Sequence, residues 1–203
     1  MNPKKHSTIA ICLITILALS PVATFAQAAT TFSGQAVALR ASAVGIALAL
    51  SDTGPLPATG GNLKTSVASV SVLGLVSADV LSSATSGRGT SSQSQSSVAD
   101  LNLLGGLVTA DLVKSNSSAS CSSGQAAVTG SSELVGLVVA GQPVVTVNPN
   151  VALSLPGGIS VIVNEQTSSP SGTTGAMTVN GLHVRGPGID IVVASAHSDI
   201  TCS

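Results

Sequence analysis

The sequence predicts an all-β fold, an antiparallel β-sandwich or barrel with long bent strands, and three observations support this prediction. Several segments alternate apolar and polar residues with the period of two that is typical of half-buried strands. Val, Ile and Thr fill these segments, while Gly, Pro and Asn separate them. No stretch shows a convincing run of apolar residues at helical spacing. A β-solenoid is the alternative, because one unit of the chain is duplicated.

The duplicated unit is the most informative feature of the chain. Residues Ser66–Ser83 recur as Ser97–Ser115, with Gly106 as the one insertion. The offset of 31 residues (97 minus 66) is within the range of stacked solenoid repeats. Only two copies are clear, however, and a solenoid normally needs three or more. The duplication therefore favours a sandwich or barrel.

The first half predicts three long strands. The first covers the alanine-rich segment Gln35–Leu50, and Asp52-Thr53-Gly54-Pro55 ends it. Each duplicated unit predicts a strand of about 20 residues, well beyond the ordinary length. Gly74 and Gly105-Gly106 interrupt these two strands, so we expect both to bend or break there. The polar segment Ser86–Ser96 between them is expected to be a mobile hairpin tip.

The second half predicts a meander, because short β-branched runs follow one another across turn residues. Its strands are expected at Val144–Val147, Val151–Leu155, Ile159–Val163, Met177–Val184 and Ile189–Ala196. Pro156-Gly157-Gly158 would join the second strand to the third, and Arg185–Gly188 the fourth to the fifth.

The N-terminus has the features of a secretory signal peptide. Two lysines precede the apolar run Ile9–Leu19, and small residues follow it. We expect residues 1–28 to be removed, with cleavage near 26–29, and residues 29–203 to form a single extracellular domain. The apolar run is shorter than the roughly 20 residues that span a bilayer. The protein is therefore expected to be secreted or associated with the cell surface, with no transmembrane segment after cleavage.

Removal of the leader leaves Cys121 and Cys202 as the remaining cysteines, and an even pair in an exported chain predicts a disulfide. Closing a loop of this size would contribute about 4.5 kcal/mol in the chain-entropy model. Two separate thiols are the alternative. Metal binding is not favoured, because the cysteines lack the close spacing of a metal site.

Composition excludes several classes of function. The chain has no Trp or Tyr and two Phe, so its core must be aliphatic, with no platform for the ring stacking of many carbohydrate and single-strand binders. Of the 7 basic residues two lie in the leader, which leaves five against eight acidic ones and a formal charge of −3. Such a chain offers no basic stripe, so we expect no nucleic-acid binding. Anionic lipid is excluded on the same ground.

Two motifs have a structural explanation. Leu56–Gly60 spells the L-P-x-T-G sorting signal, but a sortase needs that signal near the C-terminus, so we interpret it as a proline-rich turn. Asp79 and Asp111 occupy equivalent places in the duplicated unit. Calcium would need about 6–8 oxygen ligands, and none lie at short spacing. We interpret both aspartates as strand-edge charges that oppose aggregation.

Few residues could support catalysis, and no catalytic, cofactor or metal residue is assigned. His197 and Asp199 would lie on one face of a strand, and Glu165 ends another strand in the meander. An exported hydrolase built on these three residues is the alternative function. There is no Gly-x-Ser-x-Gly nucleophile motif.

Several blocks resemble the choice-of-anchor P family of exported bacterial proteins. They are Gly61–Ser83, Thr109-Ala110-Asp111, Asn164-Glu165-Gln166 and Ala194–Cys202. The resemblance implies an exported domain whose members differ in how, or whether, the C-terminus is tethered, and it implies no activity. This chain differs from anchored members in ending without a sorting tail or membrane segment. We therefore expect a non-enzymatic secreted or cell-surface domain with a structural or interaction role and an unknown extracellular partner. A self-assembling matrix or adhesive subunit is a further alternative.

Overall fold

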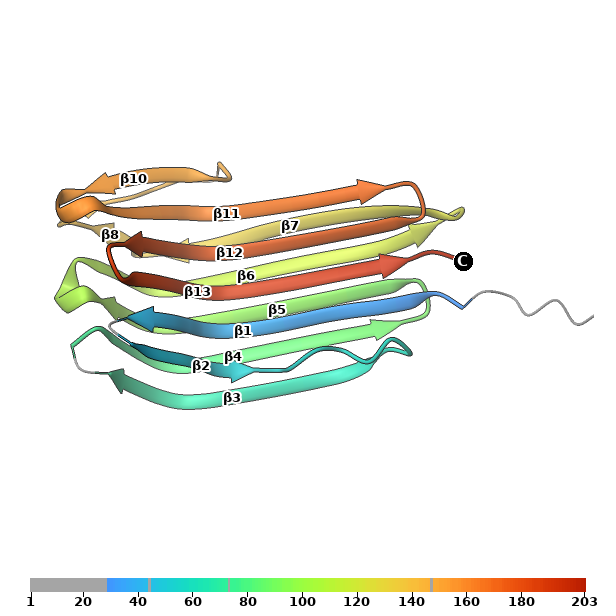
Figure 1. The fold of residues 1–203 in the computed structure, drawn as a ribbon, viewed down its shortest axis with the longest axis horizontal. Coiled ribbons are helices and arrows are strands. Elements are labelled where there is room, and N and C mark those ends of the chain that lie inside the picture. The colour runs from blue at the N-terminus through green and yellow to red at the C-terminus, as the bar shows by residue number, and fades with distance from the viewer. Residues whose placement is uncertain (1–28, 44, 73, 147) are drawn as a thin grey trace, which may run out of the picture.

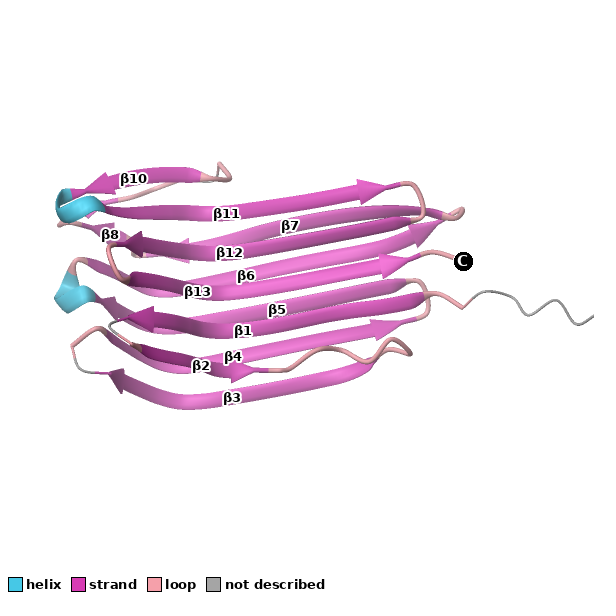
Figure 2. Cartoon of the chain, viewed as in Figure 1, coloured by secondary structure: helices cyan, strands magenta, loops and turns pink. Residues whose placement is uncertain are grey.

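The computed structural model describes residues 29–203 except 44, 73 and 147, so the predicted signal peptide lies outside the described residues. The described chain forms two antiparallel sheets that pack face to face (Figure 1). No α-helix occurs in it; the two short 3-10 turns are η1 (Leu104–Gly106) and η2 (Pro156–Gly158) (Figure 2). The prediction of an all-β antiparallel sandwich is confirmed. The two sheets share no strand in the described ranges, so they neither close into a barrel nor stack as a solenoid.

Each sheet is built mainly from hairpins between neighbours in sequence. Sheet A has the spatial order β10 (Val151–Leu155), β11 (Ile159–Ser171), β12 (Thr174–Gly186), β13 (Ile189–Thr201), β1 (Thr31–Ala43) and β2 (Ile46–Asp52). Sheet B has the order β3 (Gly61–Val72), β4 (Val76–Arg88), β5 (Ser91–Leu103), β6 (Val108–Ser122), β8 (Val138–Val139) and β9 (Gln142–Pro143), and β7 (Gln125–Val135) also pairs with β6.

The duplicated unit is a β-hairpin. The first copy contains the ends of β3 and β4 that meet at Gly74, and the second contains the ends of β5 and β6 that meet at η1. The predicted strands do not bend at Gly74 and Gly105-Gly106 but break there, the second outcome that the sequence predicted, and the chain reverses direction. These glycines have positive φ values of 64° to 94°, which suit a tight turn. The strands have 12 to 15 residues instead of about 20.

The long strands do bend, but at other residues. In sheet B the pairing of β4 with β5 shifts register around Asp79, and Val80 and Asp100 have φ values of 49°. In sheet A the pairing of β1 with β13 skips one residue on each strand, and Ala194 has φ 52°. Between β1 and β13 the register is the same on both sides of the skipped pair. The register shift between β4 and β5 is a bulge, which bends a strand and increases its twist. Figure 1 shows the resulting bend, which lies nearer one end of the sandwich.

Three other predicted elements differ from the structure. The predicted strand Gln35–Leu50 is a hairpin of β1 and β2. The predicted mobile tip Ser86–Ser96 consists of strand residues on both sides of a turn at Gly89-Thr90. Val144–Val147 is not a strand in its described residues, and Val147 lies outside them. The remaining meander strands and both of their turns are confirmed, although most of the strands extend further than predicted.

The interior changes character along the strands. At the bent end it is aliphatic, with buried residues such as Leu39, Leu81, Leu103 and Val193. Toward the other end sheet B contributes buried hydroxyls instead. These are Ser83, Thr85, Ser92, Ser94, Ser96, Ser115 and Ser117.

The two sheets approach closely where the hydroxyls lie. A Cβ added to Gly34 of β1 would come within 2.7 Å of the Thr85 hydroxyl and 3.2 Å of the His197 carbonyl. The Ser94 hydroxyl donates to that same His197 carbonyl at 2.6 Å. Small side chains and direct hydrogen bonds thus replace part of the apolar packing.

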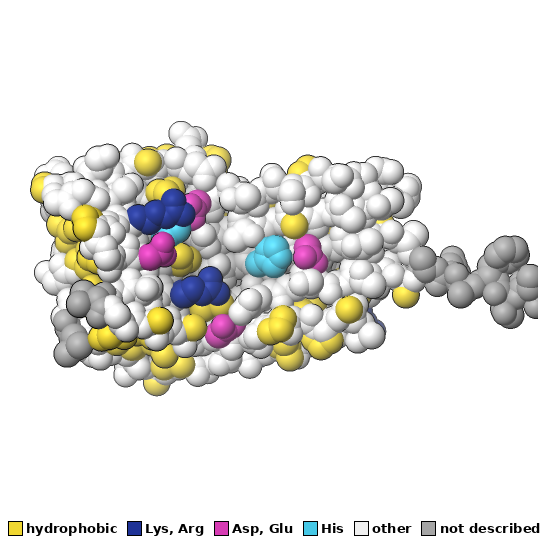
Figure 3. Space-filling model, in the orientation of Figure 1, with side chains coloured by type: hydrophobic (Ala, Val, Ile, Leu, Met, Phe, Trp, Pro, Cys, Tyr) yellow, Lys and Arg dark blue, Asp and Glu magenta, His cyan; other side chains and the backbone are white. Residues whose placement is uncertain are grey.

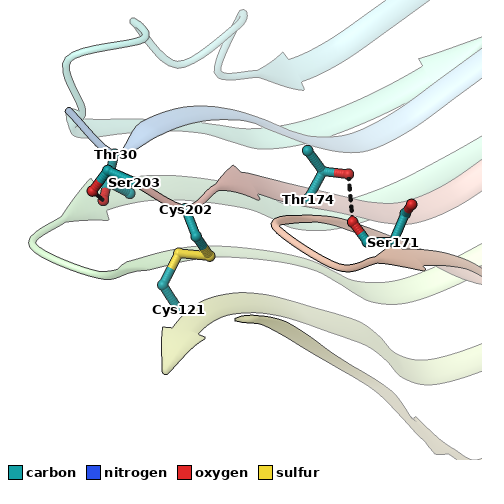
Figure 4. The surroundings of a disulfide bond; sticks show 6 residues. All are labelled: Thr30, Cys121, Ser171, Thr174, Cys202 and Ser203. Carbon is teal, nitrogen blue, oxygen red and sulfur yellow. Dashed lines mark hydrogen bonds between the residues drawn. A yellow bond between two sulfur atoms is a disulfide. The ribbon is translucent and has the colours of Figure 1, made fainter. Parts of the chain in front are cut away.

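Cys121 and Cys202 form a disulfide between the sheets, as Figure 4 shows, with sulfur atoms 2.12 Å apart. Cys121 lies near the end of β6, and Cys202 directly follows β13. The Cys202 N–H also donates to the Thr173 carbonyl at 2.7 Å. The disulfide therefore holds the C-terminal residues of the chain, which follow β13 of sheet A, against β6 of sheet B.

The L-P-x-T-G segment carries the chain from sheet A to sheet B. Leu56 is buried, and its N–H donates to the Gly34 carbonyl at 2.7 Å. The Gly60 N–H donates to the Pro57 carbonyl at 2.8 Å, which closes the turn. The structure agrees with the interpretation of this motif as a turn.

Candidate functional site

The three residues predicted for hydrolysis lie on the outer face of sheet A, where Figure 3 shows histidine and charged side chains on an otherwise largely uncharged surface. The structure divides them into two groups. Glu165 bonds to residues of β12, whereas His197 interacts with Asp199 and with Thr178.

Glu165 is the centre of the first group. Its Oε2 accepts from Asn180 Nδ2 at 2.6 Å and is 2.7 Å from His183 Nδ1. Arg185 Nη2 lies 3.4 Å from Oε1, and Arg185 Nε donates to His183 Nε2 at 3.0 Å. His183 therefore carries its proton on Nδ1 and donates it to Glu165. Asp190 Oδ1 lies 3.3 Å from His183 Nε2.

The surroundings of Glu165 lower its pKa. Partial burial alone would raise the pKa, but the hydrogen bonds from Asn180 and His183 oppose it, as do the electrostatic interactions with His183 and Arg185. The net shift is downward, so Glu165 is held ionised. With its imidazole only 7% exposed, His183 is closed in by these partners. A carboxylate with a lowered pKa is a poor general base, so this group is suited to holding β11 and β12 together.

The second group has the parts of a nucleophile and base pair. Thr178 Oγ1 lies 2.8 Å from His197 Nδ1, and Asp199 Oδ2 lies 3.6 Å from His197 Nε2. The expectation that His197 and Asp199 share a strand face agrees with this geometry. Thr178 was not predicted, because it lies on the neighbouring strand and only the register Thr178↔His197 brings it close. The 3.6 Å contact is longer than a hydrogen bond.

The aspartates of the duplicated unit are not at an edge of the sheet. Asp79 is in β4 and Asp111 in β6, and both strands have partners on both sides. Their interpretation as strand-edge charges is therefore wrong. The Asp111 carboxylate packs against Gly136, where a Cβ would clash with it. Within the described ranges, no group of three or more His, Cys, Asp or Glu side chains could hold a metal ion.

A polar groove crosses the outer face of sheet B. It has a volume of about 440 Å³ and lies over β3 to β7. Rows of residues paired across the strands form its surface. One row is Asn62, Ser86, Gln93, Ser118 and Thr129, and the next is Lys64, Ala84, Gln95, Asn116 and Ser131. A second hollow of about 380 Å³ adjoins it and shares Lys64, Ala84 and Gln95.

The amides in this groove have unused hydrogen-bonding capacity. In the part of the chain that the structure describes, the side chains of Asn62, Gln93, Gln95 and Asn116 make no hydrogen bond to protein atoms. On sheet A the amides are occupied, as Asn180 shows by donating to Glu165. Lys64 is the one charged residue among those that line the groove. The groove is therefore a nearly neutral surface rich in free donors and acceptors.

One sequence signal for this groove is the alternation of serine and glutamine in β5. The run Ser92-Gln93-Ser94-Gln95-Ser96 alternates strictly, so its two residue types belong to opposite faces of a strand. Because neither serine nor glutamine is apolar, the run lacks the apolar contrast of a half-buried strand, and its polarity favoured a loop. In β5 the serines point into the sandwich and the glutamines point out.

Comparisons with family models, curated proteins and solved structures found no match for this chain. Among the described residues, the structure contains no helix of the length and apolarity needed to cross a membrane.

Proposed function

We propose that this protein is an exported, non-enzymatic interaction domain of the secreted or cell-surface kind, and that the groove on sheet B holds its ligand. The observation that carries the proposal is the set of free amides at Asn62, Gln93, Gln95 and Asn116 on one nearly neutral surface. The signal-like N-terminus and the cysteine pair support export. The resemblance to choice-of-anchor P proteins also supports export.

The chemistry of the groove favours a neutral glycan chain. Amide and hydroxyl side chains each offer donors and acceptors, as sugar hydroxyls do. No aromatic or large aliphatic side chain lines the groove, and a polyanion would find only Lys64. Adjacent strands are about 4.8 Å apart, so a row across β3 to β7 spans roughly 19 Å, enough for a short stretch of an extended polymer. Without ring stacking, the affinity of one groove is weak.

Binding to soluble neutral polysaccharides tests this proposal. Calorimetry of the leader-free protein with a glucan, a mannan and a galactan is expected to show binding to at least one. Gln95→Ala with Asn116→Ala is expected to weaken it about tenfold, since each net hydrogen bond contributes about 0.5–1.5 kcal/mol. Gln142→Ala, an exposed amide outside the groove, is the control.

Two results would overturn the glycan proposal. One is no binding to any neutral polysaccharide at millimolar concentration; the other is equal binding by wild type and the double variant. Binding to acidic polysaccharides alone, lost in Lys64→Gln, would assign the groove to a different ligand. Export has its own test, because N-terminal sequencing of the secreted protein should start within residues 26–30.

Hydrolysis remains the second candidate, and the contact between Thr178 and His197 is the observation that favours it. A hydroxyl within 2.8 Å of an imidazole resembles an activated nucleophile. In a screen of ester, peptide and glycoside substrates we expect no turnover. Activity that disappears in His197→Ala and in Thr178→Val, with folding intact, would reverse this assignment.

A further inference from the structure

The edges of the two sheets are protected to different degrees. In sheet A the edge strands are short, because β2 has 7 residues and β10 has 5. Prolines follow both of them, at Pro55 and Pro156. In sheet B the edge strand β3 has 12 residues, contains no proline and carries one charge, Lys64. A long, weakly charged edge strand is a template for pairing with another chain.

The segment Thr65–Val72 of β3 is the part most suited to pairing. It is uncharged, and β-branched residues alternate with Ser and Ala. Its inward side chains include Val67 and Val70, which are half-buried and pack at the margin of the main core. Both the backbone and the valines of this edge would be covered by a further strand.

The opposite edge of sheet B is less open. The Ala126 N–H of β7 already donates to the Gly172 carbonyl of sheet A at 2.8 Å. Strands β11 and β12 also pack against β7. In Figure 1, β3 lies at the outer margin of the molecule, beyond β2. Sheet A reaches it at Ser51 of β2, whose hydroxyl donates to the Thr65 carbonyl at 3.0 Å.

We propose that two copies of this chain pair antiparallel through β3, about a two-fold axis between Ala68 and Ser69. A two-fold axis is the commonest symmetry of soluble oligomers and makes the strand self-complementary. An axis between residues 68 and 69 places residue n of one copy opposite residue 137 − n of the other. Val67 therefore lies opposite Val70 of the partner subunit. By the same rule Ser66 lies opposite Ser71 of the partner subunit.

This register is consistent with the faces of the strand. The alternation of β3 changes phase at Ala68 and Ser69, which are both exposed, so Val67 and Val70 both point inward, while Ser66 and Ser71 both point outward. Opposite residues must share a face in an antiparallel pair. A two-fold axis between Ala68 and Ser69 therefore joins valine to valine and serine to serine. In this register residues 65 to 72 pair with the same range of the partner subunit, and Lys64 lies outside that range, so the two lysines do not meet.

The pairing also extends the groove. Lys64 and Ser66 lie at the β3 side of the two hollows on sheet B. In the dimer the corresponding hollows of both copies meet along the seam. Two weak sites held in one rigid body would bind a polymer with higher avidity than one.

Charge variants at the outward serines test the pairing in the leader-free chain without any ligand. Sedimentation equilibrium is expected to show a dimer in the wild type. Ser66→Lys with Ser71→Lys places like charges opposite each other twice and is expected to weaken the dimer at least tenfold. Ser66→Lys with Ser71→Glu places opposite charges together and is expected to restore it. Both positions are exposed, so circular dichroism should show unchanged folding.

The control is Thr129→Lys, an exposed outward position on β7. It is expected to leave the dimer unchanged. A wild-type monomer at high concentration would overturn the proposal. A dimer that survives the double-lysine variant, or that the Lys–Glu variant fails to restore, would do so as well.

Discussion

Ser117 of β6 and Ser198 of β13 face each other across the sandwich, and their hydroxyl oxygens are 2.9 Å apart. Both side chains are buried, and they belong to different sheets. Ser198 also donates to the Ser117 carbonyl at 3.2 Å. A direct hydroxyl contact between the two sheets requires them to approach closely. The hydroxyl half of the interior thus depends on hydrogen bonds that an aliphatic core does not need.

Removing one hydroxyl of this pair should destabilise the fold. Ser198→Ala leaves the buried Ser117 hydroxyl without its partner, and we expect a loss of about 1–3 kcal/mol in the free energy of unfolding. Ser117→Ala combined with Ser198→Ala should lower the free energy of unfolding by less than the sum of the two single changes, because the double variant leaves no buried hydroxyl of this pair without a partner. Urea unfolding of the oxidised protein measures both. A single variant within about 0.5 kcal/mol of wild type would contradict the role given to this pair.

Val80 should be replaceable with a gain in stability. Its φ of 49° lies in the left-handed region, which costs an L-residue roughly 1–2 kcal/mol. Its side chain is 61% exposed, so little packing would be lost. Asn tolerates this region better, and we expect Val80→Asn to raise the free energy of unfolding by roughly 1 kcal/mol.

The control for Val80 is Val145→Asn. Val145 is 97% exposed and has no positive φ, so its replacement should leave stability unchanged. Equal effects of the two changes would show that exposure, and not backbone strain, determines the result.

Loss of the disulfide should have the largest effect. Replacing Cys121 and Cys202 by Ser removes a cross-link between residues 81 apart, and the chain-entropy model predicts a cost of about 4.5 kcal/mol. Guanidinium unfolding of wild type with and without reductant should show the same difference. Non-reducing digestion and mass spectrometry should yield a peptide pair joined through these cysteines. Two free thiols in the secreted protein would exclude the bridge.

Acid should weaken the fold partly through Glu165. Its pKa is lowered in the folded state, so the unfolded chain binds the proton more readily and stability rises with pH. The contribution is present above the pKa of an unfolded glutamate, about 4.3, and is lost as pH falls through the folded value. Glu165→Gln should flatten the acid limb of a plot of stability against pH.

The control for this variant is Glu133→Gln, at an exposed position of β7. It should leave the acid limb as in wild type. An acid limb in Glu165→Gln as steep as in wild type would show that the hydrogen bonds of Asn180 and His183 do not stabilise the ionised carboxylate.

The strands and hairpins of the second half were predictable because their alternation includes strong apolar contrast. Met177–Val184 and Ile189–Ala196 pair as expected, since each presents branched apolar side chains to one face. The run Ser92–Ser96 has the same period, but serine and glutamine differ little in hydrophobicity. Its strand, its buried face and the groove of glutamines outside it were therefore missed.

The candidate sites were predictable only in part. His197 and Asp199 were recognised together because they are two residues apart on one strand. Thr178 and His183 lie on another strand, at positions that no local spacing connects to their partners. Cross-strand register brings them together, and register depends on the turns and bulges along both strands.

By itself the amino-acid order determined that this chain forms sheet, which segments alternate and which two cysteines pair. Local preferences suffice for these, because a period of two needs only neighbouring residues and a pair of cysteines has one connectivity. The tertiary structure decided that Gly74 and Gly105 reverse the chain, that a group of serines is buried between the sheets, and that β3 lies at an edge. Those outcomes depend on how two sheets approach each other, which is a balance of long-range contacts that no single segment contains.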